Sequence, residues 1–247
     1  MDILIVNDDG IASEGLKALV EAFKVKHKVT VVAPQKQMSG MSRSVTIHKG
    51  LEHYENSTLG VTAFAIDGTP VDCVKFASLV LDLQPDLVLS GINQGENVGC
   101  DLWYSGTVGA AFEGAFLNVP SIAVSCLCEY DGQKLPFDYI AGYLEKNLDK
   151  FLKCAKPGSV INANFPNVAE SQIKGLKVTP QGLYDIWQFY ISDGSGSYRL
   201  NGGQHEFLSK QKDSDTKLLF GGYITVTPLV LDVTDHGRLA EVEEILK

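Results

Sequence analysis

The chain has 247 residues, 45% of them hydrophobic, and a formal net charge of −9 at pH 7. That length supports one α/β domain, or one domain with a smaller appendage. An acidic surface argues against nonspecific nucleic-acid binding, which depends on many Lys and Arg contacts to phosphates. No apolar run reaches the roughly 20 residues needed to cross a bilayer, and the start MDILIV lacks the basic flank of a signal peptide. We therefore expect neither a nucleic-acid nor a membrane partner.

Extended and helical patterns alternate over the first two-thirds of the chain. Strands are expected at residues 2–7, 29–33, 61–66, 86–93, 121–125 and 159–164. Helices are expected at residues 13–25, 71–83, 107–117 and 138–153. Alternating strands and helices predict an α/β fold, a Rossmann-like three-layer sandwich with a mostly parallel sheet covered on both faces.

The last third of the chain has a different pattern. Residues 174–182 and 222–233 resemble strands, and glycine and serine punctuate the polar stretch between them. We expect that stretch to form a β-hairpin arm, followed by a terminal helix at 236–247. The predicted organisation is a single domain, 1–247, with an α/β core at 1–183, a protruding arm at 184–221, and a C-terminal strand and helix at 222–247.

Cysteine usage indicates a reducing environment. The chain has five cysteines, an odd number, and most of them lie in apolar segments. Cys126-Leu127-Cys128 is C-x-C rather than the C-x-x-C of zinc and redox sites. Reduced thiols in a cytoplasmic protein are the expectation.

Two carboxylates, Asp8 and Asp9, stand side by side after the first apolar run. They repel each other unless a cation or a proton lies between them. Taken alone, Asp8-Asp9-Gly10 is equally consistent with a turn that caps the next helix. Ser39 lies in the loop after the second predicted strand, and Asn93 ends a later one; alone, they are typical of a turn and of a strand end.

These four residues are expected at one edge of the sheet, because ligands of open parallel sheets bind beyond the carboxyl ends of the strands. All the ligand atoms they offer are oxygens. Such donors suit Mg²⁺ or Mn²⁺, and Ca²⁺ less clearly. The combination therefore predicts a site for one divalent metal ion at Asp8, Asp9, Ser39 and Asn93.

A second cluster, Tyr104 to Ala111, opens the predicted helix at 107–117. Backbone N–H groups at a helix start are unpaired and favour an anion. Gly106 and Gly109 let a phosphate approach, and the hydroxyls of Ser105 and Thr107 can donate to it. The alternative is that Ser105 or Thr107 only caps the helix.

Other nucleotide-binding signatures are missing from the sequence. No G-x-G-x-x-G follows the first strand, and no G-x-x-x-x-G-K-[ST] occurs, so neither a tightly held NAD nor a P-loop is expected. None of the five histidines falls in a paired metal spacing.

Several motifs, in order along nearly the whole chain, carry a resemblance to a known family. They are residues 3–10, 33–34 with 39–42, 68–73, 90–93 with Asn97, 104–111, 162–166 and 222–229. In these motifs the chain resembles the SurE family of survival-protein nucleotidases. Two segments depart from the family pattern: Gln35-Lys36-Gln37 lacks the Asp-Arg often seen after Ala-Pro, and the arm at 184–220 matches poorly.

The resemblance implies a metal-dependent phosphomonoesterase that hydrolyses nucleoside 5′-monophosphates, with 3′-monophosphates and short polyphosphate as further substrates. It implies the same four metal ligands, and a phosphate pocket at Ser105, Gly106 and Thr107 with Asn97 nearby. It also implies a homodimer or homotetramer formed through exchanged C-terminal segments, which suits the arm.

The part that Asp8 and Asp9 play in catalysis stays open at this point. Either could accept a proton from water, act as a nucleophile, or only hold the ion. Two non-catalytic alternatives are a Mg²⁺-binding nucleotide-binding protein and a receiver-like signalling protein. A receiver needs a phosphoacceptor Asp at the end of its third strand, and the nearest acidic stretch, residues 51–57, contains no Asp.

Overall fold

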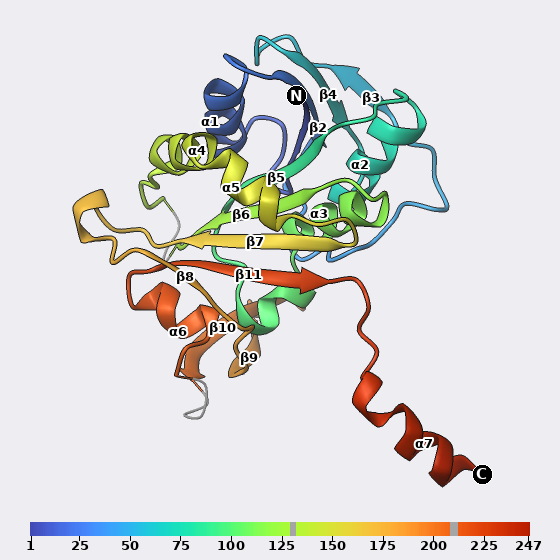
Figure 1. Cartoon of the computed structure of the whole chain (residues 1–247), viewed down its shortest axis with the longest axis vertical. Coiled ribbons are helices and arrows are strands. Elements are labelled where there is room, and N and C mark those ends of the chain that lie inside the picture. Colours follow the sequence, from blue (N-terminus) through green and yellow to red (C-terminus); the bar gives the residue numbers. More distant parts are fainter. Residues whose placement is uncertain (129–131, 208–211) are drawn as a thin grey trace.

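The computed structural model describes residues 1–128, 132–207 and 212–247. Its main feature is a nine-stranded sheet in the order β3-β4-β2-β1-β5-β6-β7-β11-β8, accompanied by a separate two-stranded sheet of β9 and β10 (Figure 1). The strands are β1 (Asp2–Val6), β2 (Lys28–Pro34), β3 (His53–Glu55), β4 (Thr62–Ile66), β5 (Leu87–Gln94), β6 (Ser121–Cys126), β7 (Ser159–Phe165), β8 (Leu176–Val178), β9 (Tyr184–Ser192), β10 (Tyr198–Phe207) and β11 (Ile224–Val230). The helices are α1 (Glu14–Phe23), α2 (Pro70–Leu79), α3 (Gly106–Phe116), α4 (Phe137–Lys146), α5 (Leu148–Cys154), α6 (Asp215–Phe220) and α7 (Leu239–Leu246).

The pairing within the large sheet confirms the predicted mostly parallel α/β fold. Strands β4, β2, β1, β5, β6 and β7 pair in parallel, while β3 and β11 each run antiparallel to a neighbour. Because the chain passes from β1 to β2 on one side and later returns to β5 on the other, strand order reverses between β1 and β5. That reversal is the place where open α/β sheets bind ligands.

Alternation along β1 shows how the two faces of the sandwich are built. Ile3 and Ile5 point into a core that contains residues of α1, α4 and α5. Leu4 and Val6 point to the opposite face, into a core that contains residues of α2 and α3. A strand segment buried on both faces is therefore apolar throughout, as β1 is from Ile3 to Val6.

Local signals account for the helix that follows β1. Ser13 caps α1 by accepting a hydrogen bond from the Leu16 backbone N–H at 3.4 Å. Leu16, Leu19 and Phe23 then recur on one face and are fully buried. The burial of that face against the sheet, rather than propensity alone, keeps a helix this short folded.

Several element boundaries differ from prediction. The helix expected at 138–153 is two helices, α4 and α5, which meet at Asn147, where the side-chain amide donates to the Tyr143 carbonyl at 2.9 Å. Only Leu176–Val178 of the strand expected at 174–182 pairs with the sheet. The edge strand β3 was not expected from the sequence.

The C-terminal third contains the expected hairpin and terminal helix. Strands β9 and β10 pair antiparallel, and α6 then returns to the body, where Asp215, Thr216 and Leu219 are buried. The last helix, α7, leaves the body after β11 and extends away from it (Figure 1). Helices long and apolar enough to span a bilayer are not found in the described ranges. The five cysteines all lie in those ranges and form no disulfide bond with one another.

The core around α1 makes a stability prediction. Phe23 is fully buried, whereas Val25 two residues later is 78% exposed. Phe23→Ala should lower the free energy of unfolding by about 3–5 kcal/mol, because it removes apolar contacts and leaves a cavity. Val25→Ala, the matched control, should change it by less than about 0.5 kcal/mol. Urea denaturation measures both, and equal effects of the two substitutions would contradict this packing.

Candidate active site

The carboxyl ends of β1 and β5 bring the acidic pair next to Asn93. Asp8 is buried, with 3% of its surface exposed, and Asp9 is half-buried. The backbone N–H of Gln94 donates to Asp9 Oδ2 at 3.0 Å, which ties the end of β5 to the turn after β1. This is the juxtaposition expected from parallel strands that share an edge.

The loop that carries Ser39 is fastened to the same place. The Met38 backbone N–H donates to the Asp8 carbonyl oxygen at 2.7 Å. Ser39 itself is exposed, and its hydroxyl accepts a hydrogen bond from the Gln37 side chain at 3.1 Å. The structure therefore places Ser39 next in the chain to a residue that bonds to Asp8, with its own side chain exposed.

Asn93 follows an irregularity in β5. The pairing of β5 with β6 shifts register between Ser90 and Asn93. Gly91, inside the shift, has φ +140°, and a Cβ there would lie 2.3 Å from the Val124 carbonyl oxygen, so only glycine fits. The Asn93 amide nitrogen donates to the Gly95 carbonyl at 2.8 Å, which leaves the side-chain carbonyl oxygen as the atom available to a cation.

The first turn of α3 packs directly on Asp8. The Thr107 hydroxyl donates a hydrogen bond to Asp8 Oδ1. Gly106 permits the close approach, since a Cβ there would lie 3.0 Å from both Asp8 Cβ and Oδ2. Ser105 caps the helix by accepting from the Val108 N–H at 3.0 Å. The capping alternative for Ser105 is thus observed, and the anion found at this helix start is the Asp8 carboxylate.

Burial sets the electrostatics of the acidic pair. It raises the pKa of Asp8 from its ordinary value, although hydrogen bonds from Thr107 and the backbone of Gly106 act in the opposite direction. Burial also raises the pKa of Asp9, to about 6, with a smaller contribution from the neighbouring Asp8 charge and an opposing one from the Gln94 N–H. Both shifts have the same main cause, which is that burial removes water from a carboxylate and so disfavours its charged form.

The donor set fits a hard divalent cation. Neither Asp8 nor Asp9 forms an ion pair with any residue that the structure describes. Clusters of three or more His, Cys, Asp or Glu suited to a metal are absent from residues 1–128, 132–207 and 212–247. A site here would use two carboxylates with the hydroxyl of Ser39 and the amide oxygen of Asn93, an all-oxygen set that suits Mg²⁺ or Mn²⁺.

Asn97, the remaining residue predicted for phosphate, is buried and held by β6 and β7. Its side-chain amide donates to Ser125 Oγ at 2.8 Å, and its backbone N–H donates to Asn164 Oδ1 at 2.8 Å. Its carbonyl oxygen accepts from the side-chain amides of Asn162 and Asn164. These bonds fix the backbone of the loop between β5 and α3 and place Asn97 beside strands β6 and β7.

The sequence reasoning missed the residues that support these loops. Asn162 and Asn164 occupy alternate positions of an apolar strand, a pattern that points two amides to one face and could have been noticed. Asp72 was missed as well. It accepts from the N–H groups of Thr69 at 2.9 Å and of Thr46 at 3.0 Å, so it joins the start of α2 to the loop between β2 and β3, which also carries Ser39. The Thr69-to-Asp72 capping box was its signal in the sequence.

Together, the fold and the site define a class of protein. It is a Rossmann-like α/β protein with a pair of adjacent carboxylates at the switch point of the sheet and a helix start packed against them.

Comparison with known proteins narrows the class to a family. The family model described as "Survival protein SurE" matches residues 3–187. Proteins named "5′-nucleotidase SurE" from Clostridium botulinum (strain Alaska E43 / Type E3) and Clostridium beijerinckii (strain ATCC 51743 / NCIMB 8052) are each 39% identical to this chain, with 100% of both chains covered. The crystal structure of the SurE protein from Aquifex aeolicus superimposes with a TM-score of 0.84 at 36% identity, covering 100% of both chains. The chain belongs to the SurE family.

The raised pKa of Asp9 makes a prediction for the metal-free protein. Because the folded state holds this proton up to about pH 6 and the unfolded state releases it near the ordinary value of 3.8, the folded state binds more protons between those values. The free energy of unfolding should therefore fall by about 1–3 kcal/mol as pH rises through that window.

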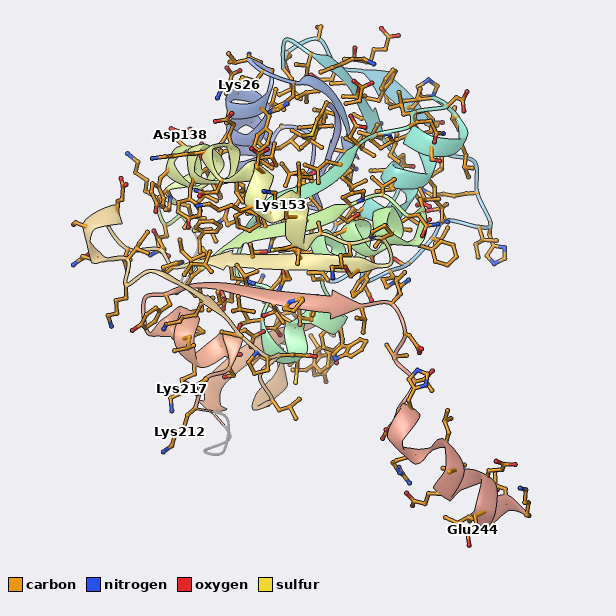
Figure 2. All side chains as sticks on the ribbon, in the orientation of Figure 1. Lys26, Asp138, Lys153, Lys212, Lys217 and Glu244 are labelled. Carbon is orange, nitrogen blue, oxygen red and sulfur yellow. The ribbon has the colours of Figure 1, made fainter. Side chains whose placement is uncertain are left out.

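Asp9→Asn should reduce this fall, since the amide does not ionise. Urea denaturation in EDTA, across the same pH range, measures the free energy of unfolding of both proteins. Asp138→Asn is the charge-matched control, because Asp138 is exposed at the start of α4 (Figure 2). An unchanged slope for Asp9→Asn would contradict the burial of the Asp9 charge.

Proposed function

We propose that the protein is a metal-dependent phosphomonoesterase, a 5′-nucleotidase that hydrolyses nucleoside 5′-monophosphates to nucleoside and phosphate. The observation that carries the proposal is the Asp8–Asp9 pair, which is largely buried, unpaired with any described cation and packed on a helix start. The full-length similarity to relatives named 5′-nucleotidase SurE supports the substrate class. Nucleoside 3′-monophosphates and short polyphosphate are proposed as further substrates.

One divalent ion, Mg²⁺ or Mn²⁺, would be held by Asp8, Asp9, Ser39 and Asn93. When bound, it supplies charge neutralisation of the phosphate oxygens and orientation of the attacking water. The protein's part is to fix the donors in advance. Thr107 and the start of α3 orient the Asp8 carboxylate, and the Gln94 N–H orients that of Asp9.

The two carboxylates have different surroundings, and this suggests different roles. Asp8 is buried and fixed by Thr107, so it suits a ligand that does not move. Asp9 is more exposed and can face water. In hydrolysis the water oxygen bonds to phosphorus, the phosphorus–ester oxygen bond breaks, and a proton from the water ends on the nucleoside oxygen. We assign to Asp9 the acceptance of that proton from water.

The phosphate group would be held by the segment from Asn97 to Thr107. Ser105 accepts from Val108 through its oxygen, so its hydroxyl hydrogen remains available as a donor. The backbone at Gly106 adds the positive end of the α3 dipole. Thr107 acts on the phosphate site through Asp8, to which it donates, and Asn97 positions the preceding loop.

Replacement of Asp8 tests the proposed activity. Asp8→Asn keeps the shape but removes a charge from the metal site, so metal-dependent phosphatase activity should fall by about 100-fold or more, beyond the effect typical of residues that only support a ligand. Release of phosphate from nucleoside monophosphates, p-nitrophenyl phosphate and polyphosphate, with Mg²⁺, Mn²⁺ or EDTA, measures it.

Asp138→Asn is again the control, and its activity should equal that of the wild type. An active Asp8→Asn enzyme with unchanged metal dependence would overturn the assignment. Bound nucleotide that is never hydrolysed by the wild type would instead support the non-catalytic nucleotide-binding alternative.

We also infer a homo-oligomer, a dimer or tetramer, formed through the C-terminal segments. Helix α7 exposes Leu239, Val242 and Ile245 at helical spacing, and in this chain it extends away from the body (Figure 1). The hairpin also exposes apolar side chains, among them Tyr190 and Tyr198. Unpartnered apolar surface of this kind is typical of an interface.

A charged substitution on the apolar side of α7 tests the assembly. Val242→Glu combined with Ile245→Glu should convert an oligomer to monomers, because two charges would be buried without partners. Glu244→Gln, at the outer end of α7 (Figure 2), is the control. Size-exclusion chromatography with light scattering measures the mass, and a monomeric wild type would contradict the inference.

A further inference from the structure

The residues that flank the β9–β10 hairpin on its two sides, which we call the bases of the hairpin, both bond to Gly99 in the loop before α3. The Gly99 N–H donates to Asp215 Oδ2 at 3.0 Å, and the Gly99 carbonyl accepts from Gln181 Nε2 at 2.7 Å. Gln181 lies just before β9, and Asp215 begins α6, after β10. Both backbone groups of Gly99 are thus held by residues that flank the hairpin.

The side chain of Asp215 is held in place by burial and by several hydrogen bonds. Its side chain is fully buried, and Oδ1 accepts from the N–H groups of Gly182 and Thr216, each at 2.7 Å. It forms no ion pair within the described part of the chain. A buried carboxylate without a cation depends on its hydrogen-bond donors, so the loss of the Gly99 N–H would leave a buried charge under-satisfied.

Apolar packing holds the same loop from the same helix. Leu219 of α6 is fully buried in a small cluster with Val98 and Leu127. Since Val98 precedes Gly99, α6 contacts two successive residues of the loop. Leu219 packs on Val98, and the Asp215 carboxylate accepts a hydrogen bond from Gly99.

The clamped residue lies between the two ends of the proposed phosphate segment. Asn97 is two residues before Gly99, and Gly99 begins a short 3-10 turn, η1 (Gly99–Trp103). The Asp101 carbonyl at the centre of this turn accepts from the N–H of Ser105 at 3.1 Å, and Ser105 caps α3. A displacement of Gly99 would therefore be transmitted to Ser105 through one rigid turn.

We propose that Asp215, together with Gln181, is a positioning residue for phosphate binding: the bases of the hairpin clamp Gly99 and thereby set the placement of Asn97 and Ser105. Neither residue touches substrate in this role. The clamp rests on the geometry alone, whereas its effect on phosphate rests on the function proposed above.

Isosteric substitution isolates the clamp. In Asp215→Asn, the amide oxygen can keep the Gly182 and Thr216 bonds, while the amide nitrogen faces the Gly99 N–H, so two donors oppose each other. In the full-length, metal-loaded enzyme, KM for adenosine 5′-monophosphate should rise by about tenfold, the scale of one lost hydrogen bond to a charged group, with kcat within about twofold of wild type. Gln181→Glu, which opposes a carboxylate to the Gly99 carbonyl, should act in the same direction and serves if Asp215→Asn does not fold.

A matched control separates positioning from loss of stability. Ser214→Ala removes the cap of α6, where Ser214 Oγ accepts from the Lys217 N–H, but leaves the Gly99 clamp intact. It should lower Tm with KM unchanged. Hydrogen–deuterium exchange should become faster at residues 97–105 in Asp215→Asn and only at 214–220 in Ser214→Ala.

A failure of the positioning role and a failure of the proposed function would give different results in these experiments. A KM for Asp215→Asn equal to that of Ser214→Ala, or unchanged exchange at 97–105, would overturn the positioning role. If the wild type hydrolysed no phosphomonoester, the proposed function would fail, while exchange and calorimetric binding of inorganic phosphate would still test the clamp. Faster exchange with an unchanged phosphate Kd would overturn the link to phosphate.

Discussion

The carboxylate of Asp8 lies against the first turn of α3, and the rest of the site is arranged around that contact. A second carboxylate follows directly in the chain, so the pair would repel if both were ionised without a counter-charge. The Thr107 hydroxyl and the backbone of Gly106 offset part of that cost on one side. Ser39 and Asn93 each follow or precede a residue whose backbone N–H bonds to this pair, and each has a side-chain oxygen to offer. We propose that a cation satisfies the remaining charge with those oxygen donors.

The topology of the sheet makes this contact possible. Because β1 and β5 are neighbours but far apart in sequence, their carboxyl ends bring together segments that the chain could not otherwise join. Parallel-strand logic was enough to predict that Asp8, Asp9 and Asn93 share an edge. The small-residue pattern separately predicted that the cluster from Tyr104 to Ala111 opens a helix. It could not predict that Thr107 would donate to Asp8 rather than to a ligand, because both arrangements use the same residues at the same spacing.

The parts that escaped prediction share a physical cause. Asp215 bonds to the backbone of a residue 116 positions away, and a backbone N–H leaves no mark in the sequence. Asp215 also follows a polar stretch, where an aspartate is typical of a turn or a helix start. The break between α4 and α5 at Asn147 was hidden for a related reason. The apolar spacing continues through it, whereas the break is defined by the backbone conformation of Asn147 and by its bond to Tyr143. The spacing of apolar residues indicates which face of a helix is buried. It does not indicate where the backbone hydrogen bonds of the helix end.

The clamp at Gly99 links two features that would otherwise be separate. The hairpin projects the surface proposed for assembly, and its two bases hold the loop proposed for phosphate. If assembly of the oligomer shifts the hairpin bases, the placement of Gly99 changes. Conversely, if bound phosphate fixes the loop at Gly99, the hairpin bases are fixed as well. Thermodynamic linkage requires these effects to be equal in size, so tighter phosphate binding in the oligomer would be accompanied by tighter assembly in the presence of phosphate. The transmitting element is short, because only η1 separates Gly99 from the cap of α3, and a single rigid turn has few internal degrees of freedom in which a displacement could be absorbed.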